Sequence, residues 1–377
     1  MMVFLILALA SGLVFLHPYI LYPLSLRLFR NRPLLLCMDG AAAAPSATLV
    51  FCAYNEAAAV PAKIENLRRI KALVPDIRFR AYVDESTDGT AALLQEHPDL
   101  LDVHVATQRT GKALGMRRLV AASDSQIVIF TDANVVVEPG SIEKLLQYFA
   151  DESVGGVCGT LHYVNPADSA TAGVNGLYWK MEERTKKLET RSGSTMGADG
   201  SIFAVRRHLY PEVPGHLLDD FIVSMSVIFA GYRLISVPDV IAYERLATRS
   251  ADEFRRKRRI ACRAYSSHRY MAGRVYGMSL LNRYKYLSHR FVRWYGAAFA
   301  ALTALFFSLW LLTTLGTGWA LGAAACVTAV VGGILSVHSG PLARISEILR
   351  AVWATILGVI DAWKGKRYQT WQPAQSR

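Results

Sequence analysis

Three short apolar runs in the N-terminal half of the chain each end on polar or acidic side chains. Runs of this length, rich in β-branched and aromatic residues, predict buried strands. Open α/β sheets bind their ligands at the carboxyl ends of the strands, so these polar side chains are expected at one edge of a sheet. The runs and their endings are 48–52 before Tyr54-Asn55-Glu56, 79–83 before Asp84, and 126–130 before Thr131-Asp132-Ala133-Asn134.

The stretches between these runs have the periodicity of amphipathic helices. Apolar residues recur every three or four positions in 57–73, and further helical segments are expected at 112–123 and 141–150. Strands that alternate with helices at this spacing predict an α/β fold with a doubly wound, Rossmann-like, mostly parallel sheet. From 173 to 207 the chain becomes more polar and is punctuated by glycines, which predicts a loop-like region before a strand at 202–205.

Long apolar segments lie near both ends of the chain. The segment 3–29 has Arg27 as its single formal charge and is long enough for a membrane span, which needs about 20 residues. A cleaved signal peptide is disfavoured, because no basic residue precedes the apolar run and no clean small-residue cleavage site follows it. Two further runs, 295–315 and 319–337, predict a helical hairpin, whereas 345–363 is amphipathic and predicts an interfacial helix.

These signals predict a multi-pass protein of the cell (inner) membrane. Basic residues follow the first apolar run, so the positive-inside rule puts the next region in the cytoplasm. The expected parts are a transmembrane helix (1–30), a linker (31–46), the α/β domain (47–245), basic interfacial helices (246–294), a transmembrane hairpin (295–338) and an amphipathic C-terminal helix with its tail (339–377).

The positive charge of the chain is concentrated in one stretch. Residues 245–293 contain fourteen Lys and Arg but only two acids, and this difference equals the net charge of +12. Aromatic residues are interleaved with these cations, a pattern that nucleic-acid-binding proteins share. Directly before a membrane segment, however, the pattern favours helices resting on anionic membrane lipids, and no nucleic acid is expected. Five cysteines without CxxC spacing give no indication of a disulfide framework or a zinc site.

Asp132 and Asn134 are the first candidates for a metal site. Residues two apart on an extended backbone point the same way, so both side-chain oxygens can face one cation. An aspartate at a strand end is more often a turn former or helix cap. The other strands that end on acids favour the functional interpretation.

In their order along the chain, these motifs closely resemble the inverting, membrane-bound glycosyltransferases of family 2, in the superfamily of the cellulose and hyaluronan synthases. The resemblance covers about 46–265 and implies a catalytic domain with the GT-A fold. Each motif is short, and the resemblance rests on their shared order. They are Tyr54-Asn55-Glu56, Asp84 to Thr90, Gly111-Lys112, Asp132-Ala133-Asn134, Gly197 to Gly200 ahead of Arg206-Arg207, Asp219-Asp220, and Arg255 to Arg259.

The resemblance implies that the first motifs bind a nucleotide diphosphate sugar, with a UDP-sugar favoured. Asn55, Glu56 and Asp84, together with Tyr54, are expected to hold the nucleoside, because carboxylates accept from uracil N–H and ribose hydroxyl groups. Glu56 also fits an acid favoured by the dipole at a helix N-terminus. Lys112 fits either a phosphate contact or a solvated lysine at the start of a helix. The sequence leaves both alternatives open.

The metal motif of the family, DxD, matches Asp132 and Asn134 with an amide in the second position. The resemblance implies that these residues bind Mg²⁺ or Mn²⁺ and that Asp132 belongs to the donor site. An amide oxygen still ligates a hard cation. An aspartate at position 134 would be expected to preserve or strengthen metal binding.

Asp220 matches the catalytic base of the family, and Asp219 replaces the glutamate that usually precedes it. A carboxylate within hydrogen-bond reach can deprotonate the acceptor hydroxyl as that hydroxyl attacks the sugar. The competing interpretation is an N-cap for the helix that begins at Phe221. Two adjacent acids exceed what capping requires, so the catalytic interpretation is favoured.

The late motif of the polymerising members, Gln-x-x-Arg-Trp, aligns with Arg256 to Ile260. Arg259 takes the arginine position and is expected to bind the diphosphate, and Arg256 is also assigned to the donor site. Arg255, Arg259 and Arg263 are four residues apart and are expected on one helical face. The missing Gln and the Ile260 replacement disfavour processive polymerisation.

The sequence therefore predicts a glycosyltransferase that adds one sugar to a membrane-associated acceptor, such as a polyprenyl-linked glycan, a lipid or a polysaccharide. A processive polysaccharide synthase is the nearest alternative, although a hairpin and one anchor are few helices for a channel. A catalytically silent scaffold that binds nucleotide sugars is a third possibility, which the presence of Asp220 disfavours.

Overall fold

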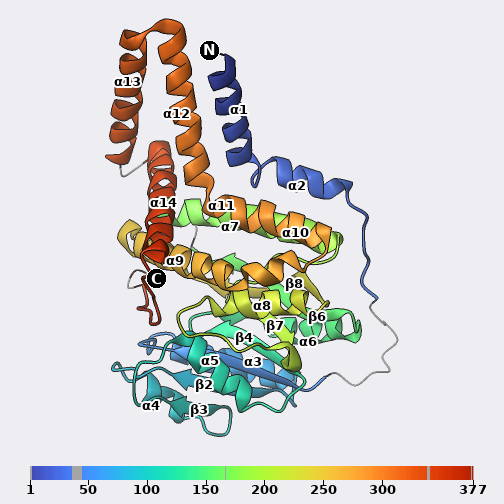
Figure 1. Cartoon of the computed structure of the whole chain (residues 1–377). Helices are drawn as coiled ribbons and strands as arrows, with labels where there is room; N and C mark the ends of the chain where they lie inside the picture. The colour runs from blue at the N-terminus through green and yellow to red at the C-terminus, as the bar shows by residue number, and fades with distance from the viewer. Residues whose placement is uncertain (1, 36–44, 166, 338–339, 375, 377) are drawn as a thin grey trace.

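The computed structural model describes residues 2–35, 45–165, 167–337, 340–374 and 376. The α/β domain and a group of apolar helices lie at opposite ends of the molecule (Figure 1). Residues 36–44, most of the predicted linker, fall outside the described part of the chain.

A single eight-stranded sheet forms the centre of the α/β domain. The first four strands in its order, β3-β2-β1-β4, are mutually parallel, and this half agrees with the predicted doubly wound sheet. The full order is β3-β2-β1-β4-β7-β6-β8-β5. The strands are β1 (Ala47–Ala53), β2 (Arg78–Val83), β3 (Asp102–Val105), β4 (Ile127–Asp132), β5 (Val136–Val137), β6 (Val154–Tyr163), β7 (Ile202–Arg206) and β8 (Arg233–Glu244).

The second half of the sheet is mixed. β7 runs antiparallel to both β4 and β6, while β8 is parallel to β6. Ile202, the first residue of β7, pairs with Thr131 near the end of β4, because the preceding loop delivers the chain to the carboxyl edge. The α/β class is confirmed, and the antiparallel β7 carries that loop directly over the ends of the parallel strands.

Helices cover both faces of the sheet. Apolar side chains of α3 (Val60–Leu73) and α6 (Gly140–Gln147) pack in one core, and those of α5 (Lys112–Ala121) and α8 (Asp219–Phe229) pack in the other. The short helix α4 (Thr90–Gln95) adds Leu94 to the first core. These helices lie close to the predicted segments, because their apolar periodicity specifies the buried face.

The prediction missed a 22-residue helix, α7 (Ala170–Arg191). Ser169 caps its start, where Oγ accepts from the Ala172 amide over 3.1 Å. The buried face of α7 is polar and includes Glu182, Lys186 and Glu189. A helix that buries charged side chains gives no hydrophobic periodicity, which is why the sequence indicated a loop-like region.

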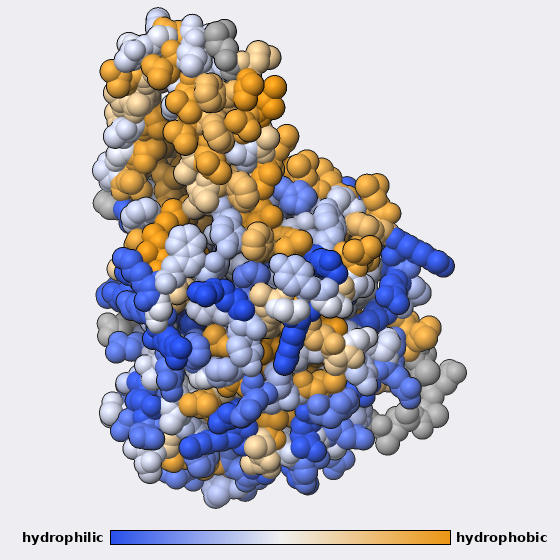
Figure 2. Space-filling view, viewed as in Figure 1, coloured by the Kyte–Doolittle hydropathy of each residue, from blue (hydrophilic) through white to orange (hydrophobic). Residues whose placement is uncertain are grey.

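Two helices, α12 (Gly296–Leu315) and α13 (Thr317–Leu335), are long and apolar enough to cross a membrane. They match the two predicted arms of the hairpin, and they form part of the apolar end of the molecule (Figure 2). α1 (Met2–Leu16) lies beside α12 (Figure 1), where Thr303 donates to Ser11 over 3.0 Å.

The prediction of one continuous helix over 3–29 is wrong. α1 ends at Leu16, and the chain turns by 67° before continuing through α2 (Leu21–Ser25) and a 3₁₀ turn to Leu28. Pro18 lies in the break, and a proline removes a backbone donor and disfavours a helical residue before it. If the bent pair counts as one span, the described residues contain three apolar segments that could cross a membrane.

The C-terminal helix α14 (Gly340–Trp363) packs closely against α9 (Ser250–Tyr276). A Cβ at Gly358 would lie 2.4 Å from the Arg258 carbonyl oxygen, so only glycine permits this approach. Asp361 accepts two bonds from Arg258, of 2.7 and 2.8 Å. Large apolar residues remain exposed on α14, among them Leu342, Ile345, Ile348 and Trp353.

Six of the fourteen basic residues of 245–293 contact other parts of the protein, so a leaflet does not account for all of this charge. Each of six makes an ion pair or hydrogen bond to a different element of the fold. The sequence shows that this stretch is basic but not which way its side chains point. The six are Lys257 and Arg258 with Arg263 on α9, Lys285 on α10 (Leu280–Tyr286), and Arg290 and Arg293 just after it.

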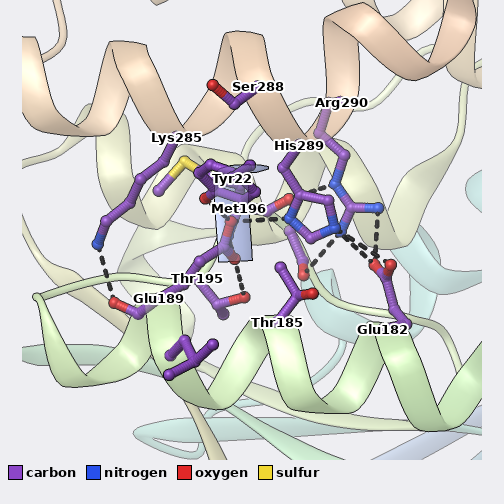
Figure 3. Close-up of polar contacts among 12 residues, drawn as sticks. Tyr22, Glu182, Thr185, Glu189, Thr195, Met196, Lys285, Ser288, His289 and Arg290 are labelled. Atoms are coloured by element: carbon purple, nitrogen blue, oxygen red, sulfur yellow. Dashed lines mark hydrogen bonds and ion pairs between the residues drawn. The ribbon is translucent and has the colours of Figure 1, made fainter. Parts of the chain in front are cut away.

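A buried group that we call the Glu189 cluster joins α2, α7 and the chain after α10 (Figure 3). Glu189 accepts from the Tyr22 hydroxyl, from His289 Nδ1 over 2.8 Å, and from the Met196 amide over 3.0 Å. Lys285 donates to the Glu189 carbonyl over 2.8 Å. These five residues define the cluster, and they fix the membrane-proximal helices to the α/β domain.

A neighbouring carboxylate, Glu182, is shared by three basic side chains. Arg293 lies 2.6 Å, Arg290 3.2 Å and His289 3.1 Å from its oxygens. Burial alone would raise the pKa of Glu182, but these side chains hold the pKa well below its usual range. At Glu189, burial alone would also raise the pKa, but His289 and the hydrogen bonds that Glu189 accepts lower it to about 2.

We expect Glu189→Gln to reduce stability by roughly 3–5 kcal/mol at neutral pH, the scale for breaking a buried ion pair. Because the folded pKa lies below the usual value of 4.5, the stability supplied by Glu189 is present above about pH 4.5 and lost as the pH falls towards 2. Thermal unfolding of detergent-solubilised protein at pH 7 and pH 3.5 measures this. An equal loss of melting temperature on acidification in both proteins would contradict the assignment.

Candidate active site

Side chains from four segments converge at the carboxyl end of β4. Lys112, the first residue of α5, donates to Asp132 Oδ1 over 2.5 Å. A Cβ added at Gly200 would lie 3.0 Å from Lys112 Nζ, 3.2 Å from Asp220 Oδ2 and 3.9 Å from Asp132 Oδ2. A side chain at position 200 would therefore crowd this centre, and glycine leaves it open.

The convergence of carboxylates sets the protonation behaviour of the site. Burial would lower the pKa of Lys112, but the three surrounding carboxylates outweigh it and raise the pKa above its usual range. Burial and the adjacent Asp219 raise the pKa of Asp220 to about 7. A carboxylate with a pKa near the working pH can take a proton and release it again, which suits a general base.

Asp219 and Asp220 open α8, as predicted. Asp219 is buried, with Oδ1 3.6 Å from Arg263 Nη2, and Arg263 also donates to the Leu217 carbonyl. Asp220 Oδ1 accepts from the Phe221 amide over 2.7 Å, while Oδ2 faces Gly200. α8 begins at Asp219, Leu218 takes the N-cap position, and no side chain among the described residues caps the helix, so the competing N-cap interpretation of Asp220 is wrong. Asp220 Oδ2 is left facing the centre.

Asp84 is fully buried behind the loop 109–111 and does not face a cleft. Its oxygens accept from the Thr110 amide over 2.7 Å, from the Gly111 amide over 3.0 Å, and from Arg109 Nε over 3.1 Å. Gly111 has a φ of +87°, a conformation that favours glycine. Asp84 therefore fixes the loop that leads into Lys112.

Arg109 forms the exposed part of this loop and lies between two aromatic rings. Its guanidinium carbon is 3.3 Å from the centre of the Tyr54 ring and 5.7 Å from that of Trp371. Arg109 Nη2 also donates to the Trp371 carbonyl over 2.7 Å. The two rings meet at a centroid distance of 6.0 Å and an angle of 73°.

The C-terminal tail after α14 thus reaches the α/β domain. Gln369 donates to the Thr110 carbonyl over 3.0 Å, and a Cβ at Gly111 would lie 2.2 Å from the Gln369 carbonyl oxygen. Further on, Ser376 donates to Asp252 over 2.8 Å. The C-terminal tail is thus a strap across the loop 109–111.

The loop after β1 is held to the loop after β2. Asn55, with a φ of +51°, accepts from the Thr87 amide over 2.8 Å. The Glu56 amide donates to Thr90 Oγ1 over 3.0 Å, and Asp88 accepts from the Ala57 amide over 2.9 Å. Asn55 thus shapes the turn that presents Tyr54, and the Glu56 side chain is half-buried.

Asn134 lies two residues after Asp132 and is oriented by Glu244 at the end of β8. Asn134 Nδ2 donates to Glu244 Oε1 over 3.0 Å, so the carbonyl of the amide points away from Glu244. Burial would lower the pKa of Arg256, but Glu253, Tyr163 and Glu244 raise it. Arg256 therefore lies close enough to Glu244 to balance part of its charge.

The donor set at this edge fits a hard divalent cation. The Asp132 carboxylate is about one-third exposed, and the free face of the Asn134 amide is a carbonyl oxygen. The described residues contain no group of three His, Cys, Asp or Glu side chains that could hold an ion alone. A cation held by Asp132 and Asn134 would take its remaining oxygens from a diphosphate and water, which suits Mg²⁺ or Mn²⁺.

The arginines of α9 do not share one environment, contrary to the expectation from their spacing. The Arg255 side chain is 73% exposed and pairs with Asp252, whereas Arg263 is buried against Asp219. Arg259 lies between them on the helix and is half-buried. Four-residue steps advance the helical angle by about 40° each, which turns Arg255 away from the side on which Arg263 lies.

Sequence reasoning assigned no role to four residues of this region. Lys63 donates to the backbone carbonyls of Asp132 and Val135 over 2.9 and 2.8 Å and so stabilises the turn that contains Asn134. A lysine on the apolar face of a predicted helix could have indicated a role for Lys63. Glu244 is an acid at the end of a strand, so the pattern that indicated Asp132 could also have indicated Glu244. Nothing local indicated the contact between Arg109 and Trp371, which are 262 positions apart.

The sheet order and the solved structure described below show the GT-A fold. The particular family follows from the sequence: residues 44–262 match the family described as "Glycosyltransferase like family 2". This is more than half of the chain, and the protein belongs to that family. None of the curated proteins is similar enough in sequence to count as a match.

One solved structure supports the fold. The chain is similar to the mannosyltransferase PcManGT from Pyrobaculum calidifontis, solved in complex with GDP-Man and Mn²⁺, with 19% identity and a TM-score of 0.73. That likeness covers 96% of this chain and 99% of the other. A mannosyl-3-phosphoglycerate synthase from Rubrobacter xylanophilus is 17% identical, with a TM-score of 0.41, over 61% of this chain and 76% of that chain.

We expect Asn134→Asp to weaken metal-dependent nucleotide binding, the reverse of the expectation from sequence. The new carboxylate would face Glu244, and two like charges about 4 Å apart repel by roughly 1–4 kcal/mol, so binding falls about tenfold or more. Calorimetry of nucleoside diphosphate binding, with Mn²⁺ and with chelator, measures the effect. The double variant with Glu244→Gln should recover binding, and tighter binding by Asn134→Asp alone would disprove the orientation.

Proposed function

We propose that the protein is an inverting glycosyltransferase of the membrane surface that moves one sugar from a nucleotide diphosphate sugar to a membrane-associated acceptor. The observation that carries the proposal is the convergence of Asp220, Lys112 and Asp132 at the open centre beside Gly200. A base, a cation and an acidic metal ligand are the groups that displacement of a nucleoside diphosphate requires.

Asp220 acts as the base in this proposal. Its Oδ2 takes the proton of the acceptor hydroxyl as that oxygen attacks the anomeric carbon from the side opposite the leaving group, which inverts the configuration. Asp219 raises the pKa of Asp220 towards neutrality and is itself held by Arg263. Asp219 is thus a positioning residue.

In this proposal, Lys112 supplies positive charge to the departing diphosphate, and Arg256 and Arg259 of α9 would bind the same group. The Lys112 ammonium is bonded to Asp132, so the two charges offset each other. A divalent ion held by Asp132 and Asn134 would offset the charge that develops on the leaving group.

The nucleoside belongs, in this proposal, beside Tyr54 and Arg109. Asn55 and Glu56 shape the loop that presents Tyr54 to the nucleoside. Asp84 acts through the loop 109–111, because both of its oxygens are already bonded there. The related mannosyltransferase binds GDP-Man, which supports a nucleotide sugar as donor. A UDP-sugar remains our assignment, and competition between UDP and GDP for the purified protein tests it.

The acceptor approaches from the membrane side in this proposal, at the cytoplasmic face of the inner membrane. The apolar helices α12 and α13 form the anchor, together with α1, and the exposed apolar side of α14 lies on the leaflet. A lipid-linked glycan or a lipid fits this arrangement. Among the arginines of α9, the exposed Arg255 would meet anionic membrane lipids.

Single addition is favoured over processive synthesis. Neither α12 nor α13 buries a residue, so the hairpin encloses no channel within the described part of the chain. Ile260, in the position that is aromatic in polymerising members, cannot stack on an acceptor sugar. The silent scaffold is disfavoured because Asp220 has the pKa of a working base.

Replacement of Asp220 by Asn should lower transfer by roughly 10²–10⁴-fold while donor binding changes little, because proton transfer alone is removed. The wild-type rate should fall as the pH drops below about 7, where Asp220 becomes protonated, and the residual rate of the variant should not follow that profile. A transfer assay beside calorimetry with donor alone separates the two steps. Equal losses of binding and turnover would show that Asp220 is structural.

With donor in large excess, the purified protein should lengthen its acceptor by a single sugar. Processive synthesis needs the growing chain held between additions, and neither an aromatic at position 260 nor an enclosed channel is available for this. Mass spectrometry of the product decides the matter. A ladder of long oligomers would support the processive alternative.

A further inference from the structure

A cavity of about 230 Å³ opens at the bend between α1 and α2. One wall comes from the bend and the other from α7, and Arg293 closes it from the chain after α10. The bend lies at the foot of the apolar helices, where the hydrophobic surface gives way to a hydrophilic one (Figure 2). The lining residues are Pro18, Tyr19, Ile20, Pro23, Leu24, Arg27, Met181, Arg184, Thr185, Leu188 and Arg293.

The polar groups of the cavity are cationic. Arg27 and Arg184 are exposed, and neither forms an ion pair with any residue in the described ranges. Arg293 is 13% exposed and binds Glu182, but its Nε is buried and has no hydrogen-bond partner among the described residues. Glu182 is already shared with Arg290 and His289, so it leaves the cavity with excess positive charge.

The remaining walls are apolar and continue towards the apolar helices. Ile20 is 50% exposed, Leu24 51% and Met181 42%, an arrangement that leaves much apolar surface uncovered at the cavity mouth. Tyr19 stacks on Arg293, whose guanidinium carbon lies 5.6 Å from the ring centre. Guanidinium groups above an apolar wall suit a ligand with an anionic head and an apolar tail.

We infer that this cavity binds the phosphate headgroup of an anionic membrane phospholipid, with the acyl chains along the exposed apolar residues of the bend. Arginine is suited to this role, because its planar fork binds phosphate oxygens in pairs. The lipid would fill the space between the bend and α7 and so brace the N-terminal helices against the helix that carries Glu189. The inference rests on the membrane placement proposed above.

Native mass spectrometry of the full-length protein in detergent, with added phosphatidylglycerol, tests this site. The double variant Arg27→Glu/Arg184→Glu should retain the lipid at least about tenfold less well, because each basic residue at an anionic surface contributes roughly fivefold. Leu24→Trp should also reduce retention, since it fills the cavity and leaves the charges unchanged. The matched control, Arg269→Glu/Arg274→Glu, changes two exposed arginines of α9 and should retain the lipid as the wild type does.

Three results would overturn the inference. One is unchanged retention in the cavity variants, and another is an equal loss in the control, which would indicate unspecific attraction to the surface. The third is displacement of the lipid by inorganic phosphate alone, which would indicate a site for small anions. Membrane fractionation and the transfer assay are run on the same proteins. If the wild-type protein is membrane-bound and active and any of these three results is obtained, this site is disproved and the proposed function still stands.

Discussion

The catalytic edge depends on a concentration of negative charge that the fold must balance. Asp132, Asp219 and Asp220 approach one another where β4 ends and α8 begins, and like charges at this spacing raise the cost of ionising each of them. Lys112 balances the first and Arg263 the second. At Asp220, burial and the adjacent Asp219 outweigh the attraction of Lys112 and Arg263, and its pKa rises to about 7. The proton affinity of Asp220 thus follows from its burial beside a second carboxylate.

Local sequence patterns predicted those side chains of the carboxyl edge that lie on consecutive helices and strands. Lys112 starts a helix that follows one parallel strand, and Asp132 ends the next strand along the chain, so both are expected at the carboxyl edge of the sheet. The orientation of Asn134 was not predictable, since its partner Glu244 lies 110 positions further along the chain. Trp371 reaches Tyr54 only through the path of the whole chain.

In the membrane-proximal region, sequence patterns predicted the apolar helices but not the contacts of the basic residues. Hydropathy found the apolar helices, and the proline in 3–29 was the available sign of the bend. The basic stretch was interpreted as a surface because charge is usually solvated. Its inward arginines need carboxylates that come from α7 and α14, and α7 has no apolar periodicity. A buried polar helix is thus invisible to the same patterns that find the rest of the fold.

That helix also joins the two halves of the molecule. Arg290 contacts Glu182 on α7 and donates to the Met196 carbonyl over 2.6 Å, in the loop that continues to Gly200. Gly200 lies between Lys112 and Asp220. The contacts that dock the membrane-proximal helices onto α7 are therefore continuous with those that shape the loop over the catalytic carboxylate. Asp220 is held in a fixed relation to the membrane-proximal end of the molecule, which is the geometry that an enzyme needs when its acceptor lies in the bilayer.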